Sequence, residues 1–139
     1  MTGHIFSTDF GPEHQSWDVP PVRLFRAKVK KKIESKGVAH TLSNLASGVD
    51  YLVLWLDCDR EGENICFEVI SCTAGRMNKL GGGRRQQIFR AKFSAVTKPD
   101  IERAMRTLGE PNENEALSVD ARQELDLKLG VAFSRFQTR

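Results

Sequence analysis

The fold of this chain is decided by residues 51–63, which read Tyr-Leu-Val-Leu-Trp-Leu-Asp-Cys-Asp-Arg-Glu-Gly-Glu. The stretch begins with an apolar run, Tyr51 to Leu56, that shows no polar alternation. Such a run predicts a strand buried on both faces, as in a parallel sheet covered by helices. A helix is predicted over residues 63–75, with Ile65 and Val69 on one side. The acids between strand and helix therefore lie at the carboxyl end of a strand, where open α/β sheets bind their ligands.

Four acidic side chains follow the apolar run within seven positions: Asp57, Asp59, Glu61 and Glu63. In an extended chain Asp57 and Asp59 project to the same side, and Glu61 joins them if the extension continues to Gly62, which then permits a turn. Carboxylates this close repel one another, so some stay protonated or a cation neutralises them. Ligands that are all oxygen suit Mg²⁺ before Ca²⁺ and exclude Zn²⁺. Asp57, Asp59 and Glu61 are therefore predicted to hold Mg²⁺ for chemistry on a phosphodiester.

Two other interpretations of these acids stay open. The first is a charged strand end in solvent. The second is a calcium-binding loop, because Asp57, Asp59, Glu61, Gly62 and Glu68 nearly fit the spacing D-x-[DN]-x-[DN]-G-x5-E. A glutamate at the third ligand position, an asparagine where that loop is usually apolar, and a strand-like segment in place of the first helix disfavour it.

The stretch from Leu54 to Val69 resembles the acidic motif of the TOPRIM domain in type IA DNA topoisomerases, and the eukaryotic topoisomerase III enzymes of the beta type in particular. The resemblance continues along the chain in the family's order. It covers residues 3–5, 9–10 and 17 before the motif, and residues 89–97, 108–111, 115–127 and 133–139 after it. Several motifs in register are far more specific than the D-x-D-x-E pattern alone.

The resemblance implies an α/β fold with a TOPRIM-like (Rossmann-like) parallel sheet and flanking helices. Residues 1–112 would form this domain without its first strand, and residues 113–139 a long helix leading into the next domain. Asp57, Asp59 and Glu61 would hold the Mg²⁺ cofactor, and Glu63 would help to orient the catalytic site.

For the whole enzyme, the resemblance implies relaxation or decatenation of DNA by single-strand cleavage, strand passage and religation without ATP. The implied partner is single-stranded DNA, with RNA as an alternative and with an accessory protein subunit. The implied location is the nucleus, and also the cytoplasm.

Four further side chains are predicted to line the nucleic-acid groove: His4, Arg90, Arg122 and Asp126. Arg122 and Asp126 are four residues apart on a predicted helix and can form an ordinary ion pair; the resemblance places them beside the acids. Arg90 shares one side of a predicted strand with Lys92, and either faces DNA or lies at an exposed edge. His4 belongs to a Gly-His pair that lies near the acidic cluster in the family, and a plain surface histidine is the alternative.

The chain is expected to be an internal piece of a topoisomerase III. TOPRIM domains begin with a strand that ends in a catalytic Glu, and no such strand precedes Gly3. These enzymes cut DNA with a tyrosine nucleophile, whereas the only tyrosine here, Tyr51, opens the predicted strand. At about 3.3 Å per residue it lies roughly 20 Å from Asp57, so the isolated chain is predicted not to cleave DNA. Two rival functions stay open: a stand-alone TOPRIM nuclease or primase-like module, and a non-catalytic nucleic-acid-binding module.

Size and composition set wide limits. A chain of 139 residues is one domain at most, and large enough for a core. A net charge of +3 is weak evidence for a nucleic-acid partner. No apolar run approaches the roughly 18 residues of a membrane span, so no membrane partner is expected. The three cysteines form no C-x-x-C pair, which disfavours a zinc site or a disulfide scaffold.

The remaining sequence predicts short elements and one long helix. Residues 1–10 are predicted to form a strand, 11–22 a proline-rich loop, 23–36 a solvated basic segment, 40–45 a helix, 81–83 a flexible loop, 87–94 a second strand and 97–108 a helix capped by Thr97. A long amphipathic helix is predicted over residues 114–139. Its apolar stripe is assigned to the core: Leu117, Ala121, Leu125, Leu129, Ala132 and Phe136.

Overall fold

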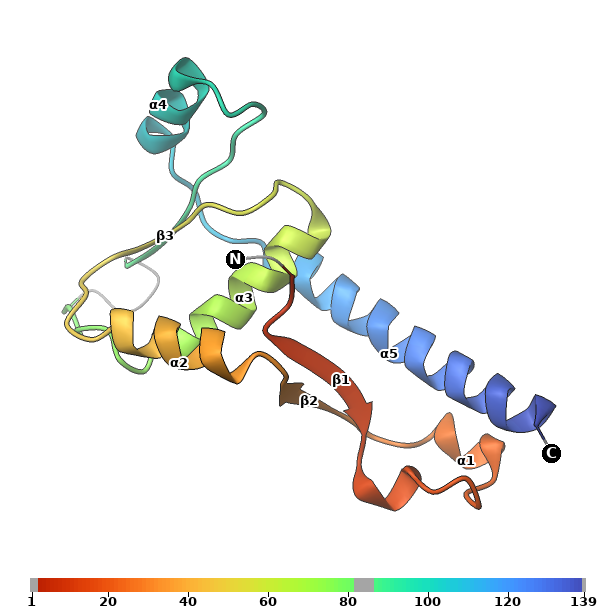
Figure 1. Cartoon of the computed structure of the whole chain (residues 1–139). Helices are drawn as coiled ribbons and strands as arrows, with labels where there is room; N and C mark the ends of the chain where they lie inside the picture. Colours follow the sequence, from red (N-terminus) through yellow and green to blue (C-terminus); the bar gives the residue numbers. More distant parts are fainter. Residues whose placement is uncertain (1–2, 82–86, 139) are drawn as a thin grey trace.

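The computed structural model describes residues 3–81 and 87–138. In chain order it contains β1 (Phe6–Phe10), the short 3₁₀ helix η1 (Pro12–His14), α1 (Pro21–Leu24), β2 (Val29–Ile33), α2 (Lys36–Leu45), β3 (Leu52–Leu54), α3 (Arg60–Thr73), β4 (Ile88–Arg90), α4 (Lys98–Arg106) and α5 (Glu113–Gln137), as Figure 1 shows. None of the described helices has the length and apolar character needed to span a membrane. Part of the predicted flexible loop, residues 82–83, lies outside the described residues.

The described strands form two separate pairs. β3 and β4 run parallel, with Leu54 opposite Arg90, and the connection between them contains α3, as a parallel crossover requires. The predicted parallel sheet with flanking helices is therefore confirmed. β1 and β2 pair antiparallel, with Phe6 opposite Ile33. The basic segment that was expected to be only a solvated face thus contains a strand, β2, whose lysines are exposed.

β3 is shorter and less buried than its apolar run predicts. Leu54 is 3% exposed, but Trp55 is 38% exposed. Side chains alternate along a strand, so Leu54 faces a core to which α2 and α3 both contribute. On the opposite side of the strand, the ring of Tyr51 contacts that of Phe89, and the ring of Trp55 contacts that of Phe93. Because both helices contribute to one core and the aromatic side is exposed, the prediction of a strand buried on both faces is wrong.

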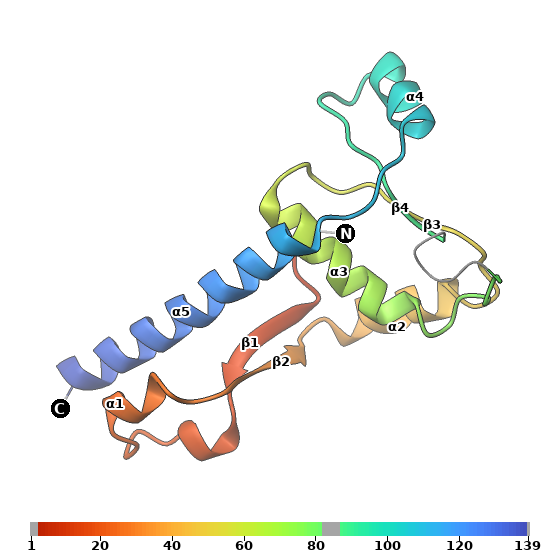
Figure 2. The same cartoon turned by 180° about the vertical axis from the view of Figure 1, so that it is seen from behind.

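α5 lies along α3 near its start and along α1 near its end, in both views of the molecule (Figures 1 and 2). Its buried residues are Ala116, Val119, Ala132 and Arg135. Most of the predicted apolar stripe is exposed, including Leu125 and Phe136, and only Ala132 of that stripe is buried. Both sides of this helix carry apolar residues, so helical spacing alone did not indicate which side packs.

Two hydrophobic clusters support these elements. The first joins β3, β4, α3 and the start of the chain through Ile5, Leu54, Cys66, Val69 and Ile88. The second joins β1, α1 and the end of α5 through Phe10, Leu24, Ala27 and Ala132. The acidic stretch lies beside the first cluster, at the carboxyl end of β3.

Candidate functional site

The acidic stretch turns into a helix earlier than predicted. Asp59 is the N-cap of α3: its backbone is extended, and its Oδ1 accepts a hydrogen bond of 2.7 Å from the Gly62 amide. Aspartate is a strong N-cap residue, so the helix begins at Arg60 rather than at residue 63. Glu61 therefore lies in the first helical turn and does not extend the line of Asp57 and Asp59, which corrects the geometry predicted for these three acids.

Gly62 has a different role from the turn predicted for it. It lies inside α3, and a Cβ atom there would meet the Asp57 carbonyl oxygen at 1.9 Å. The glycine thus permits the first turn of the helix to approach the backbone of the acidic stretch. The positive end of the helix dipole comes close to the acids in this way, and favours their negative charge.

Glu61 contacts two of the residues that were predicted to line the nucleic-acid groove, His4 and Arg122. Its Oε2 lies 3.2 Å from His4 Nε2, and its Oε1 accepts a hydrogen bond from Arg122 Nη2. Arg122 Nη1 lies 3.8 Å from Asp126 Oδ2, so the predicted pair between these two residues of α5 is confirmed. The first residues of the chain, α3 and α5 therefore bring His4 and Arg122 to one carboxylate of the acidic motif.

Glu68 was named from the sequence only as the last position of the disfavoured calcium-binding loop, and its contact with His4 was not predicted. It is buried, its Oε2 accepts a 2.7 Å hydrogen bond from the Ile5 amide, and its Oε1 lies 3.0 Å from His4 Nδ1. His4 thus lies between two carboxylates, and both contacts are hydrogen bonds only when both ring nitrogens carry a proton. The spacing of Glu61 and Glu68, two helical turns apart, could have indicated that they share one side of α3.

Arg90 and Glu63 form a buried ion pair, with Arg90 Nε 2.9 Å from Glu63 Oε1. Arg90 is 0% exposed, so the prediction that it faces DNA or an exposed edge is wrong. Strand alternation places it on the same buried side as Ile88. Arginine is almost never fully buried unless it is paired, and Glu63 supplies that pair here.

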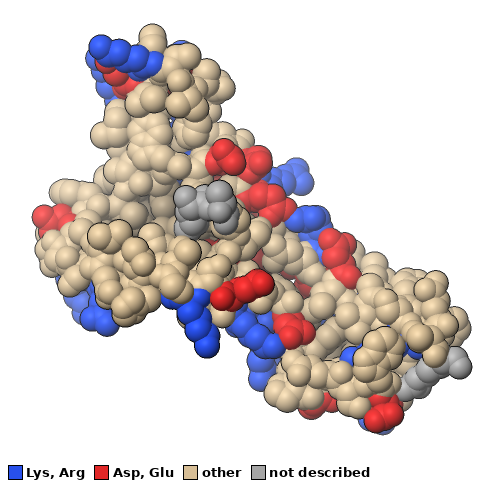
Figure 3. Space-filling model, viewed as in Figure 1, with Lys and Arg blue, Asp and Glu red and all other residues tan. Residues whose placement is uncertain are grey.

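On the face drawn in Figure 3, a group of acidic side chains lies over the segment that joins β3 to α3, with basic side chains beside it. Within residues 3–81 and 87–138, however, no group of three His, Cys, Asp or Glu side chains is placed to hold a metal ion. The predicted convergence of Asp57, Asp59 and Glu61 is absent from this arrangement, because the helix start directs Glu61 toward His4 and Arg122.

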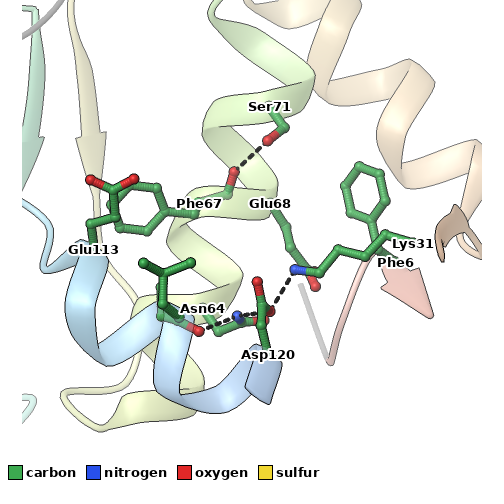
Figure 4. Close-up of a pocket in the computed structure, with 10 residues that line it drawn as sticks. Phe6, Lys31, Asn64, Phe67, Glu68, Ser71, Glu113 and Asp120 are labelled. Atoms are coloured by element: carbon green, nitrogen blue, oxygen red, sulfur yellow. Dashed lines mark hydrogen bonds and ion pairs between the residues drawn. The ribbon is translucent and has the colours of Figure 1, made fainter. Parts of the chain in front are cut away.

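A hollow of about 250 Å³ lies behind this site, between β1, β2, α3 and α5 (Figure 4). An ion pair of 2.6 Å between Lys31 and Asp120 spans part of it. Asn64 donates to the same Asp120 Oδ1 at 2.6 Å and to the Ala116 carbonyl at 2.8 Å. The contacts of Lys31, Asp120 and the Asn64 amide nitrogen connect α5 to α3 and to β2. Asn64 Oδ1 is buried without a hydrogen-bond partner among the described residues. It meets the acidic site through Glu68, which lines both.

The chain is similar to known proteins over nearly its whole length. The Toprim domain model matches residues 1–96. DNA topoisomerase 3-beta of Arabidopsis thaliana is 56% identical over 142 residues, which cover 99% of this chain and 16% of that protein. DNA topoisomerase 3-beta-1 of Homo sapiens is 51% identical over 143 residues, which cover 100% of this chain and 16% of that protein. The structure of full-length topoisomerase I from Thermotoga maritima matches 90% of this chain and 19% of its own, with a TM-score of 0.57 and 25% identity.

The chain therefore belongs to the Toprim domain family, and its expected similarity to topoisomerase III of the beta type is confirmed. The mixed α/β fold agrees with the solved topoisomerase I structure. The chain spans 16% of the length of the two curated relatives, so the similarity concerns one segment of those proteins.

Proposed function

We propose that this chain is the Mg²⁺-binding segment of a type IA DNA topoisomerase of the topoisomerase III class. The whole enzyme would change DNA topology without ATP by cutting one strand, passing another through the gap and resealing the cut. The observation that supports this most strongly is the contact between Arg122 and Glu61, which are 61 residues apart. It joins an arginine, a side chain suited to binding phosphate, to the acidic motif.

The acids that follow β3 fit a hard metal ion in their chemistry. Mg²⁺ is usually held by one or two carboxylates, with water and substrate phosphate at its other positions. Asp57 and Asp59 would supply these carboxylates, and Glu61 would join them when it is released from Arg122. When bound, the ion would place positive charge against the phosphate oxygens of the cut strand.

Arg122 and His4, the two side chains that contact Glu61, would bind the nucleic acid. Arg122 presents a planar guanidinium that suits a phosphate group, and Asp126 and Glu61 hold it in place. His4 is fixed by Glu68 and would contact the same strand. Single-stranded DNA is the proposed partner, with RNA as an alternative, and an accessory subunit and a nuclear location of the whole enzyme are proposed on the family resemblance alone.

This chain would not supply the nucleophile for strand cleavage. Its only tyrosine, Tyr51, lies just before β3, whereas Asp57 follows β3 at the other end. Tyr51 also contacts the ring of Phe89, away from the acids. The proposal assigns the reactive tyrosine to another part of a longer enzyme.

The proposal is tested by titrating the purified chain with Mg²⁺ in a calorimeter and with labelled oligo(dT) in a fluorescence anisotropy assay. The chain should bind both Mg²⁺ and the oligonucleotide weakly. Asp57→Asn should weaken Mg²⁺ binding by roughly tenfold or more. Removing a residue that only hydrogen-bonds to a metal ligand typically lowers metal affinity by about tenfold or more, and Asp57 is proposed as a ligand itself. Asp18→Asn, which removes an exposed acid far along the chain from the motif, should leave Mg²⁺ binding unchanged.

The other outcomes separate the rival functions. Relaxation of supercoiled DNA by the isolated chain would contradict the proposal. Metal-dependent nicking that Asp57→Asn abolishes would instead indicate a stand-alone nuclease. Oligonucleotide binding that ignores both EDTA and Asp59→Ala would indicate a non-catalytic binding module.

A further inference from the structure

We propose that Arg90 is the positioning residue of the acidic stretch, and that Glu63 is its partner rather than a metal ligand. This inference rests on the function proposed above, because it concerns how the same acids are held in place. It assigns separate roles to the four acids of the motif: Asp57, Asp59 and Glu61, once released from Arg122, would bind the ion, and Glu63 anchors the backbone.

The guanidinium of Arg90 binds the backbone that leads from β3 to the first acid. Nη1 donates to the Leu56 carbonyl at 2.8 Å and to the Leu54 carbonyl at 3.3 Å, and Nη2 donates to the Asp57 carbonyl at 2.7 Å. Residues 55–57 have no regular secondary structure. Buried carbonyl groups need partners, and one side chain from the neighbouring strand supplies them along this segment.

Glu63 completes the arrangement on the other side of the guanidinium. It is 2% exposed, and each of its carboxylate oxygens accepts a hydrogen bond from the protein. Oε1 accepts from Arg90 Nε at 2.9 Å, and Oε2 accepts from the Asn112 amide at 2.8 Å. A carboxylate that is buried and paired in this way is not available to a metal ion at the surface.

The same pair also fixes the helix that brings Arg122 to the site. Asn112 is the N-cap of α5, and its side chain accepts hydrogen bonds from the amides of Asn114 and Glu115. Glu63 holds the Asn112 amide, so the start of α5 is tied to the first turn of α3. Arg90 and Glu63 together therefore connect the end of β3, β4, α3 and α5 at one buried point.

The chemistry of this point requires arginine. A guanidinium offers several N–H groups in a fixed plane, so it reaches Glu63, the three carbonyl groups of this segment and the Ala91 carbonyl together, whereas the ammonium group of a lysine is a single point. Removing either charge would leave the other buried and unpaired, which is costly. Arg90→Lys keeps the positive charge but loses the planar set of N–H donors. This variant therefore distinguishes the effect of the hydrogen bonds to the backbone from the effect of the charge.

The experiment compares Arg90→Lys with Val69→Ala, a substitution in the adjacent core that touches none of these carbonyls. Amide hydrogen exchange is followed by NMR, with denaturant added so that the two variants have equal global stability. Arg90→Lys should accelerate exchange of the Ala91 amide, which donates to the Leu54 carbonyl, and of the Asn112 amide, which donates to Glu63, by tenfold or more relative to Val69→Ala. It should also weaken Mg²⁺ binding. Equal exchange of these two amides in the two variants would overturn the proposal.

Glu63→Gln gives a second test, which also applies if Arg90→Lys does not fold. It retains an acceptor of similar shape but removes the charge, so exchange of the Ala91 and Asn112 amides should accelerate together with any loss of Mg²⁺ affinity. Weaker Mg²⁺ binding with unchanged exchange would identify Glu63 as a ligand and refute the assignment. Wild-type chain that binds no Mg²⁺ would reject the proposed function, while the exchange comparison would still decide the role of Arg90.

Discussion

Gly62 shows, at the scale of a single residue, how closely α3 approaches the acidic stretch. A Cβ atom at this position would lie 1.9 Å from the Asp57 carbonyl oxygen, the same oxygen that Arg90 binds. Gly62→Ala must push that carbonyl away, and overpacking of this kind costs about 1–3 kcal/mol. We expect urea denaturation to show this loss of stability, and calorimetry to show weaker Mg²⁺ binding.

Gly130 provides the matched control for this substitution. It also lies inside a helix, α5, but an added Cβ would meet no atom within 4 Å. Gly130→Ala should therefore stabilise the protein by up to about 1 kcal/mol through helix propensity alone. If the two alanine variants had equal stability, the close approach at Gly62 would not constrain the fold.

Cys66 provides a prediction about alkaline pH. Burial raises the pKa of its thiol from an ordinary value of 9.0 to about 11. The unfolded chain releases this proton near pH 9 and the folded chain near pH 11, so this contribution to stability is complete below pH 9 and is lost as the pH rises to 11. The free-energy difference between wild type and Cys66→Ala, measured by urea unfolding, should therefore shrink over this range. A constant difference up to pH 11 would show that the thiol does not titrate differently in the folded state.

Some residues of the site could be recognised from the local sequence, whereas others can be recognised only from how the chain packs. The acids after β3 were recognisable because hydrophobic and acidic runs meet within a few residues. Arg122 and Asp126 were recognisable as a pair from their helical spacing, and their place beside Glu61 came from the family resemblance. Arg90 was assigned to an exposed position and Glu68 only to a disfavoured calcium-binding loop, because their bonding partners Glu63 and His4 lie 27 and 64 residues away along the chain.

At the scale of elements, α5 shows that an apolar side chain on a helix is not always a buried one. Val119 is 3% exposed, whereas the larger Leu125 is 56% exposed. Val119→Ala should therefore cost on the order of 2 kcal/mol of stability, and Leu125→Ala should change it by about 0.5 kcal/mol or less. Thermal unfolding of both variants measures this difference. The reverse order would mean that the side of α5 carrying Leu125 forms the core.

The strands and helices were predicted well where local signals are strong. Thr97 was predicted as a helix cap and is the N-cap of α4, whereas the cap at Asp59 was not predicted and α3 begins three residues earlier than expected. The parallel pair of β3 and β4 follows from an apolar run before an acidic turn. Burial was predicted poorly, because an apolar run shows that a segment is able to pack but does not show what covers it. Trp55 and Leu125 are both exposed for this reason.

For the whole molecule, the two hydrophobic clusters form two regions joined by α5. One contains the acidic site, β3, β4 and α3, and the other contains α1, the end of β1 and the end of α5. α5 contacts α3 in the first region and α1 in the second. The site therefore depends on a helix whose far end is held by a separate core.

This division predicts how the molecule opens. Leu24 is fully buried in the second cluster, and Leu24→Ala should cost about 2–5 kcal/mol in that region. Because regions with separate cores can open separately, amide exchange should accelerate in α1, β2 and the second half of α5, with little change in α3. Val69→Ala should give the opposite pattern, since its side chain lies in the first cluster. Equal acceleration of α3 in both variants would mean that the two clusters unfold as one unit, and that damage at α1 reaches the acidic site directly.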